Sequence, residues 1–302
     1  MQKIIPHLWF DTEAKEAAEF YVSAFGDGSK VTNVTTLHDT PTGDCDVVSF
    51  DLRGYSFMAI SAGPLFQFNP SISFMLNFDP STDKDARKNL DVLWEKLSDG
   101  GEALMPLDKY PFSEHYGWIK DKYGVTWQLI LTNPEGEPRP FIIPSLMFVG
   151  DMTGKAEEAI DFYVSVFKDS KRGMTARYSA GSAPDTEGTI IFADFMIEKQ
   201  WFAAMDSAGP HRFSFNEAIS LLVRCDTQEE IDYYWSKLSA VPAAEQCGWL
   251  KDKYGISWQI SPDIMDDMLQ SGDQEKTTRV TQAFLKMKKI DLSALQKAYE
   301  GR

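Results

Sequence analysis

Cysteine is scarce in this chain, and the three that occur are far apart. Cys45, Cys225 and Cys247 are odd in number, and none of them stands in a CxxC pair. Small secreted domains usually carry even sets of cysteines, and structural zinc sites usually carry closely spaced pairs. The sequence therefore argues against a disulfide framework and against a cysteine-based zinc site.

Long apolar runs and an excess of basic residues are also missing. No segment approaches the roughly 20 apolar residues that cross a bilayer, and the first residues lack the basic and apolar regions of a signal peptide. The formal net charge is −15, with an isoelectric point near 4.7, and such a surface repels a phosphate backbone. We expect a cytoplasmic protein with neither a nucleic-acid nor a membrane partner.

Several segments of the chain occur twice, in the same order. GWIKDKYGVTWQ at 117–128 returns as GWLKDKYGISWQ at 248–259, and KEAAEFYVSAF at 15–25 returns as EEAIDFYVSVF at 157–167. Repeated blocks with loops of different length between them indicate a duplicated domain. We predict domains at 1–131 and 141–262, joined by a linker at 132–140 that is rich in proline, glycine and polar residues. A tail at 263–302 follows, predicted as three helices that cap the second domain.

Each repeat consists of two similar halves. The first half of the first repeat shows a strand at 3–10, an amphipathic helix at 15–25 and three runs rich in β-branched and aromatic residues. The second half shows a strand at 71–79, a helix at 85–97, a strand at 102–107 and the hairpin at 117–128. The pattern βαβββ followed by βαβββ predicts an α+β fold.

The repeated hairpin places its aromatic and amide side chains by alternation. Its turn is Asp121-Lys122-Tyr123-Gly124, where glycine allows a positive φ. If Lys120 pairs with Val125, Trp118 lies opposite Trp127 on one face of the sheet. Gln128, and Gln259 in the second copy, then project from the other face.

The repeated motifs, FYVSAF and FYVSVF, AGPxxxFN and the GW(I/L)KDKYG(V/I)(T/S)WQ hairpin, resemble the PhnB-like branch of the vicinal oxygen chelate (VOC) superfamily over residues 1–262. The resemblance implies two tandem domains, each a cupped, mainly antiparallel sheet of paired βαβββ modules with helices outside. VOC copies commonly pair, so we expect the two domains to form an intramolecular pseudo-dimer, and a further homodimer stays open. Names in this branch often mention a ubiquinone-pathway methyltransferase. The sequence has no glycine-rich loop of the adenosylmethionine-binding type to support that name.

The resemblance also implies where a metal would bind, and the residues there are poor ligands. Glyoxalase-type members pair a histidine in the first strand with a glutamate in the last strand of the sheet. The matching residues are His7 and Gln128 in the first repeat and Ser145 and Gln259 in the second, with Ser73, Ser220 and Asp206 nearby. A divalent ion usually needs three or four imidazole or carboxylate ligands. We therefore expect no metal or other cofactor and keep His7 and Gln128 as weak metal candidates.

Three functions stay open. The first is metal-independent binding of a small molecule by candidate residues His7, Gln128, Gln259, Trp118, Trp249, Tyr110, Phe112 and His115. The last three come from a predicted loop at 106–118, which either closes a pocket or only covers the sheet. The second is a glyoxalase, lyase or dioxygenase that uses a divalent metal in the first domain. The third is a structural or interaction protein whose cups are filled by side chains. The shortage of metal ligands favours the first function over the second, and whether the chain is an enzyme stays open.

Overall fold

The computed structural model of the chain describes residues 2–26, 28–40, 43–133 and 137–302. The predicted linker 132–140 therefore lies partly outside the described residues. The chain forms two compact units: unit 1 takes Met1–Ser23, Asp27–Gln67 and Phe215–Arg302, and unit 2 takes Ala24–Gly26 and Phe68–Ser214. The units do not coincide with the sequence repeats. Each unit combines the first half of one repeat with the second half of the other.

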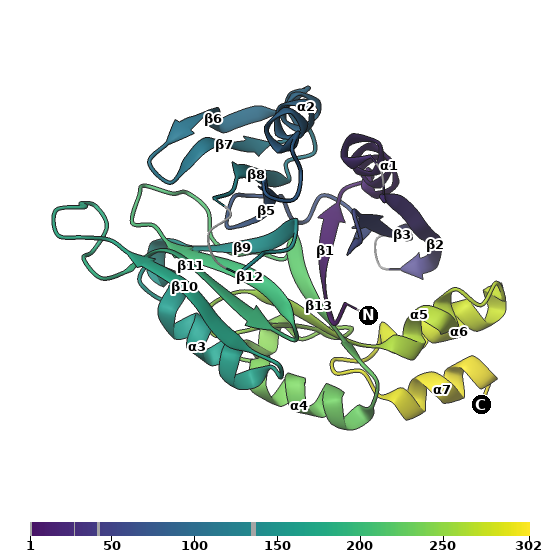
Figure 1. Ribbon diagram of the computed structural model, residues 1–302. Helices are drawn as coiled ribbons and strands as arrows, with labels where there is room; N and C mark the ends of the chain where they lie inside the picture. The colour runs from purple at the N-terminus through teal and green to yellow at the C-terminus, as the bar shows by residue number, and fades with distance from the viewer. Residues whose placement is uncertain (1, 27, 41–42, 134–136) are drawn as a thin grey trace. The chain divides into compact units, whose positions relative to one another are not determined.

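Unit 1 contains a seven-stranded sheet in the order β14-β15-β13-β1-β4-β3-β2 within the described residues. Its strands are β1 (Ile4–Phe10), β2 (Lys30–Thr40), β3 (Gly43–Leu52), β4 (Tyr55–Ser61), β13 (Ile219–Cys225), β14 (Trp249–Lys251) and β15 (Ser257–Pro262). Its helices are α1 (Ala14–Phe25), whose last residues belong to unit 2, α4 (Gln228–Leu238), η2 (Pro242–Ala244), α5 (Asp263–Leu269), α6 (Gln274–Phe284) and α7 (Leu292–Glu300). Figure 1 labels these elements.

Unit 2 contains an eight-stranded sheet in the order β10-β11-β12-β9-β5-β8-β7-β6 within the described residues. Its strands are β5 (Ile72–Phe78), β6 (Glu102–Tyr110), β7 (Ser113–Lys120), β8 (Thr126–Leu131), β9 (Ile142–Phe148), β10 (Lys171–Arg177), β11 (Ile190–Ile197) and β12 (Gln200–Asp206). Its helices are α2 (Ala86–Ser98), η1 (Gly150–Met152) and α3 (Ala156–Val166). The predicted loop 106–118 is instead mostly the β6–β7 hairpin.

The two repeats meet inside each sheet through apolar central strands. In unit 1, β1 pairs antiparallel with β13; in unit 2, β5 pairs antiparallel with β9. Nearly all residues of these four strands are buried, as expected for strands covered on both faces. Most strand pairs are antiparallel, with parallel pairs such as β1–β4 and β13–β15. The predicted α+β fold of paired βαβββ modules is confirmed.

Helices cover one face of each sheet, which we call the outer face. In unit 2, Tyr163 of α3 stacks on Phe195 of β11, and α3 lies along β10–β12 in Figure 1, while α2 packs on β7 and β8. In unit 1, Tyr21 of α1 stacks on Phe50, and α4 packs on β15. The opposite face, which we call the inner face, is the concave side expected to hold a site. None of the described helices is long and apolar enough to span a membrane.

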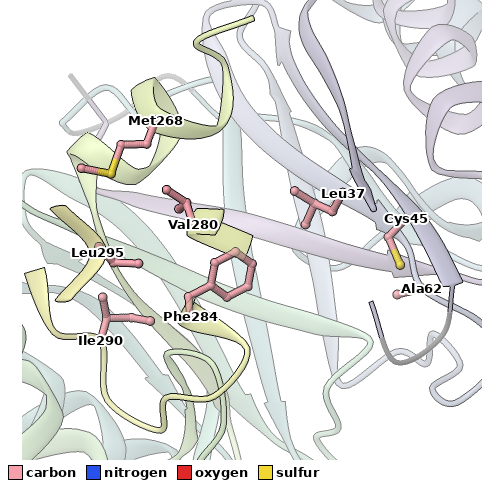
Figure 2. Packing of buried hydrophobic residues seen from close by; sticks show 8 residues of the cluster. All are labelled: Leu37, Cys45, Ala62, Met268, Val280, Phe284, Ile290 and Leu295. Carbon is pink, nitrogen blue, oxygen red and sulfur yellow. The ribbon is translucent and has the colours of Figure 1, made fainter. Parts of the chain in front are cut away.

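The C-terminal tail packs on the inner face of unit 1. Val280 and Phe284 of α6 and Leu295 of α7 form one buried cluster with Leu37 of β2 and Cys45 of β3, as Figure 2 shows. Leu37 and Cys45 pair on neighbouring strands of the first repeat. The predicted tail therefore packs on strands of the first repeat as well as on the second repeat, where the Cys247 and Gly248 backbone N–H groups donate to the Met287 and Lys288 carbonyls.

The register of the repeated hairpin differs from the predicted one by one residue. Lys120 pairs with Thr126, Ile119 with Trp127, and Trp118 with Gln128. Trp118 and Gln128 therefore share the inner face, and Trp127 lies buried on the outer face. The prediction that the two tryptophans share one face and Gln128 the other is wrong, and the turn chemistry explains the difference. The Asp121 carboxylate accepts hydrogen bonds from the backbone of Tyr123 and Val125, which lengthens the turn.

Candidate functional site

A row of side chains crosses the inner face of unit 2 from strand to strand. Neighbouring strands place Asp194 beside Ala203, Ala203 beside Ser145, and Ser145 beside Ser73. On the other side, Gln128 pairs with Trp118. We call this set the unit-2 row: Asp194, Ala203, Ser145, Ser73, Gln128 and Trp118.

Gln128 is held at the middle of this row by two hydrogen bonds. Its amide nitrogen donates to Ser73 Oγ at 2.7 Å, and the Tyr116 hydroxyl donates to its Oε1 at 2.7 Å. Gln128 is 3% exposed, and burial raises the pKa of Tyr116 above its ordinary value. The orientation of the amide is therefore fixed by neutral partners.

Two polar atoms of the unit-2 row have no partner. Among the described residues, Ser145 Oγ and Trp118 Nε1 are buried and make no hydrogen bond. A buried polar group without a partner costs on the order of 1–3 kcal/mol. Native proteins normally satisfy such groups with protein, water or ligand atoms. These two atoms mark where a bound molecule would gain hydrogen bonds.

Aromatic residues of the β6–β7 hairpin lie beside the row, and His115 does not. Phe112 packs against Tyr116 at 4.9 Å between ring centroids, and Tyr110 packs against both. His115 Nε2 instead lies 2.5 Å from Asp91 of α2, so its side chain is on the outer face. Of the three hairpin candidates, the structure therefore brings Tyr110 and Phe112 near Gln128 through Tyr116 and removes His115 from the site.

Unit 1 carries an equivalent row with different chemistry. Strand by strand, the unit-1 row is Ser49, Met58, His7, Ser220, Gln259 and Trp249. Gln259 donates to Ser220 Oγ at 2.9 Å, as Gln128 does to Ser73. The His7 ring meets Trp249 edge-on at 5.7 Å between centroids. The row equivalence shows that His7 replaces Ser145, and Met58 replaces Ala203.

His7 is buried in the middle of the unit-1 row. Its Nδ1 has no hydrogen-bond partner among the described residues, and it is 4% exposed. Burial lowers the pKa of His7 to about 4, because the charged form would lose its hydration. His7 is therefore neutral at pH 7.

The inner face of unit 1 is largely occupied. Trp9, Val47 and Ile60 of this face pack against the buried cluster that the tail completes. A cavity of about 100 Å³ remains beside α5, lined in part by Ser49, Met58, Arg224 and Asp266. That volume is enough for several water molecules.

Neither row fits the divalent metal of glyoxalase-type relatives. The two weak metal candidates belong to different units, His7 to unit 1 and Gln128 to unit 2. The unit-1 row offers one imidazole with a thioether, two hydroxyls and an amide. The unit-2 row offers one carboxylate, which Arg139 already pairs at 2.8 Å. Within the described residues, no three His, Cys, Asp or Glu side chains are grouped as ligands.

Asp206, which the sequence placed near the predicted metal position, instead has a structural role. Its carboxylate accepts from the backbone N–H groups of Gly154, Ala156 and Ile190 at 2.7–3.1 Å. Burial raises its pKa despite these bonds. It caps the start of α3 and contributes nothing to the row.

The sequence interpretation missed Asp194, Arg139 and Trp201, which lie at one end of the unit-2 row. The Arg139 guanidinium lies 3.6 Å above the centre of the Trp201 ring. A signal existed, because Asp194 is a lone acid in the apolar run IIFADFMI. Arg139 falls in the predicted linker, and no pattern connects a linker residue with a strand.

Comparisons with known proteins agree with this architecture. The family model described as 3-demethylubiquinone-9 3-methyltransferase matches residues 2–130 and again 140–261. A PhnB protein structure from Bacillus cereus is 34% identical, covering 43% of this chain and 100% of that one, with a TM-score of 0.39. Glyoxalase I from Zea mays is 12% identical over 85% of this chain and 92% of that one, with a TM-score of 0.51. No curated protein matches the chain.

The family match covers both repeats, and the maize structure shares the fold. Each of the two matched segments spans one of the repeats recognised in the sequence. The chain therefore belongs to this family, the PhnB-like branch of the VOC superfamily, as a tandem two-repeat member.

Proposed function

We propose that unit 2 binds a small molecule on its inner face without a metal ion, at the unit-2 row. The observation that carries the proposal is the pair of buried, unpartnered atoms, Ser145 Oγ and Trp118 Nε1. They lie on either side of Gln128 and Ser73 in the strand order. A ligand that fills this face would satisfy both atoms.

The surrounding residues indicate the chemistry of the ligand. An indole N–H can only donate a hydrogen bond, so the ligand needs an acceptor oxygen or nitrogen near Trp118. Met75, Ile143 and Trp201 form an apolar cluster on the same face. Binding sites of this kind combine an apolar lining with a few fixed polar groups. The ligand is therefore a largely apolar molecule with at least one acceptor.

Unit 1 plays a different part in this proposal. Its tail covers the face that corresponds to the site in unit 2, so we assign unit 1 to scaffolding. In this proposal, the structural role considered as the third function applies to unit 1 alone.

Catalysis by a metal or by methyl transfer has less support. Apart from His7, the ligands expected of a glyoxalase or dioxygenase are replaced by Ser, Gln, Met and Ala in the two rows. The family description names a methyltransferase. The first strand of this chain, however, is followed by DTEAKEA rather than by a glycine-rich loop.

The test is a nuclear magnetic resonance titration of protein treated with a chelator. Benzamide, a small ring with a carbonyl acceptor, is added, and the indole N–H signal of Trp118, assigned by its loss in Trp118→Phe, is followed. We expect this signal to move in the absence of metal. The proposal is wrong if the signal stays in place at saturating benzamide, or if it moves only after a divalent metal is added.

A further inference from the structure

A chain of hydrogen bonds runs from the β6–β7 hairpin into the unit-2 row. The Tyr116 hydroxyl lies 2.7 Å from Gln128 Oε1, and Gln128 Nε2 lies 2.7 Å from Ser73 Oγ. All three side chains are buried. Tyr110 and Phe112 pack edge-on against the Tyr116 ring, which holds the hydroxyl in place. The position of the phenol therefore decides how the Gln128 amide is turned.

The phenol also sets the direction of the chain. Burial raises the pKa of Tyr116, so the hydroxyl keeps its proton at pH 7. In the described part of the chain, Gln128 is the one hydrogen-bond partner of that hydroxyl. A phenol is a stronger donor than an aliphatic hydroxyl, so the Tyr116 hydrogen takes the amide oxygen. The amide N–H then faces Ser73, whose Oγ accepts and keeps its own hydrogen free to donate.

Ser73 lies next to an atom that already marks the proposed site. Ser73 and Ser145 are directly paired on β5 and β9, where side chains on one face stand about 5 Å apart. Ser145 Oγ has no hydrogen-bond partner among the described residues, so the Ser73 hydroxyl does not donate to it. A ligand atom that reaches Ser145 is therefore also within reach of Ser73.

The second repeat has a different residue in place of the phenol. Gln259 makes the corresponding bond to Ser220 Oγ, at 2.9 Å. The residue before its GW pair, however, is Cys247, where the first repeat has Tyr116. The Cys247 thiol lies 3.6 Å from the Leu285 carbonyl oxygen. The phenol therefore belongs to the unit that we assign to binding, although the hairpin that follows is nearly the same in both repeats.

We propose that Tyr116 is a positioning residue of the unit-2 site, and that it turns Gln128 so that the Ser73 hydroxyl donates to an acceptor atom of the ligand. The inference rests on the proposed function and adds a second donor to the Trp118 N–H. Ser73 and Trp118 lie on β5 and β7, with β8 between them, so their backbones are about 10 Å apart. The ligand class is therefore a molecule with two acceptors several ångströms apart.

The experiment compares two neutral probes. Benzamide has one carbonyl, and terephthalamide has a second carbonyl at the opposite end of the ring. Their dissociation constants are measured from the Trp118 indole signal of chelator-treated protein. We expect terephthalamide to bind about 5- to 10-fold more tightly than benzamide to the wild type, the worth of one hydrogen bond. In Tyr116→Phe, which removes one oxygen atom, the ratio should fall to about twofold or less.

The outcomes separate the inference from the proposed function. An equal ratio in wild type and Tyr116→Phe would overturn the inference and leave the proposed function standing, and so would equal binding of both probes to the wild type. A merely structural role of Tyr116 would weaken both probes alike and leave the ratio unchanged. No movement of the Trp118 signal with either probe would contradict both.

Ser73→Ala removes the proposed donor itself and gives a second test. It should lower the ratio as far as Tyr116→Phe does. The double variant Tyr116→Phe, Ser73→Ala should lose no more than either single variant, because Tyr116 acts through Ser73. Losses that multiply would mean that Tyr116 acts by another route and would overturn the inference. The matched control is Cys247→Ala, at the equivalent position of the second repeat, which should keep the wild-type ratio.

Discussion

At the scale of the residue, the difference between the two rows centres on His7 and Ser145. Both occupy the same place in equivalent strands, and both carry a buried polar atom without a partner. Unlike the serine hydroxyl, the buried imidazole of His7 can also gain a proton within the ordinary pH range. Its effect on stability is therefore measurable as a function of pH.

We predict that His7 makes the protein less stable in acid. Burial lowers the folded-state pKa of His7 to about 4, whereas an unfolded histidine titrates near 6.5. The unfolded state therefore binds more protons between these values, and stability falls as pH drops from about 6.5 to about 4. The loss is on the order of 3 kcal/mol. Urea unfolding at pH 7 and pH 4.5 measures it.

The control is His7→Met, which replaces the imidazole by an apolar side chain of similar length that does not titrate. Its stability should depend less steeply on pH than that of the wild type over the same interval, since the other three histidines are unchanged. At pH 7 it should be equally stable or more so, because an unpartnered nitrogen is removed. Identical pH dependence in the two proteins would show that His7 does not titrate as described.

At the scale of the element, the repeated KDKYG turn is a stabilising device. Asp121 accepts from the backbone of Tyr123 and Val125 and from Trp127 Nε1 at 2.8–3.1 Å. Asp252 makes the same three bonds in the second copy, including one to Trp258 Nε1. Both tryptophans are fully buried. The near-identity of the two segments follows from this shared network.

We predict that Asp121→Ala and Asp252→Ala each destabilise the protein by about 3 kcal/mol. Each change leaves a buried indole N–H and two backbone N–H groups without an acceptor. The midpoint of urea unfolding measures the loss, and Lys122→Ala, a change on the exposed side of the same turn, is the control. A loss below about 1 kcal/mol would mean that water replaces the carboxylate.

The same turn separates the features that the sequence predicts correctly from those that it does not. The repeats and the βαβββ pattern followed from the sequence, whereas Gln128 entered as a candidate through the family resemblance and was placed on the face opposite Trp118. The one-residue error in register arose because Asp121 organises a longer turn, and a shift of one residue exchanges the faces of a strand. The exchange of halves was not predictable either. β5 (ISFMLNF) and β13 (ISLLVRC) are both mostly apolar and begin with the same two residues, so alternation does not say which of them pairs with β1.

At the scale of the whole molecule, each compact unit contains strands from both repeats. β1 pairs with β13, and β5 pairs with β9, so two antiparallel seams join the first repeat to the second. We propose that this arrangement is the intramolecular counterpart of the paired copies expected from the family resemblance. A single repeat would leave apolar edges of both seams exposed.

We predict that cutting the linker leaves the protein assembled. A protease site introduced at 134–136 would divide the chain between the repeats. The two fragments should elute together in gel filtration and separate only in denaturant, because both seams stay paired. Fragments that separate in native buffer would contradict the shared sheets.

The central claim is that the unit-2 row binds a ligand while the unit-1 row does not. The most direct measurement is calorimetric titration of benzamide into wild type, Trp118→Phe and Trp249→Phe, which change equivalent positions of the two rows. We predict that Trp118→Phe weakens binding about 5- to 10-fold, the worth of one hydrogen bond, and that Trp249→Phe leaves the affinity within about twofold. Equal losses in both variants, or a loss confined to Trp249→Phe, would contradict the account.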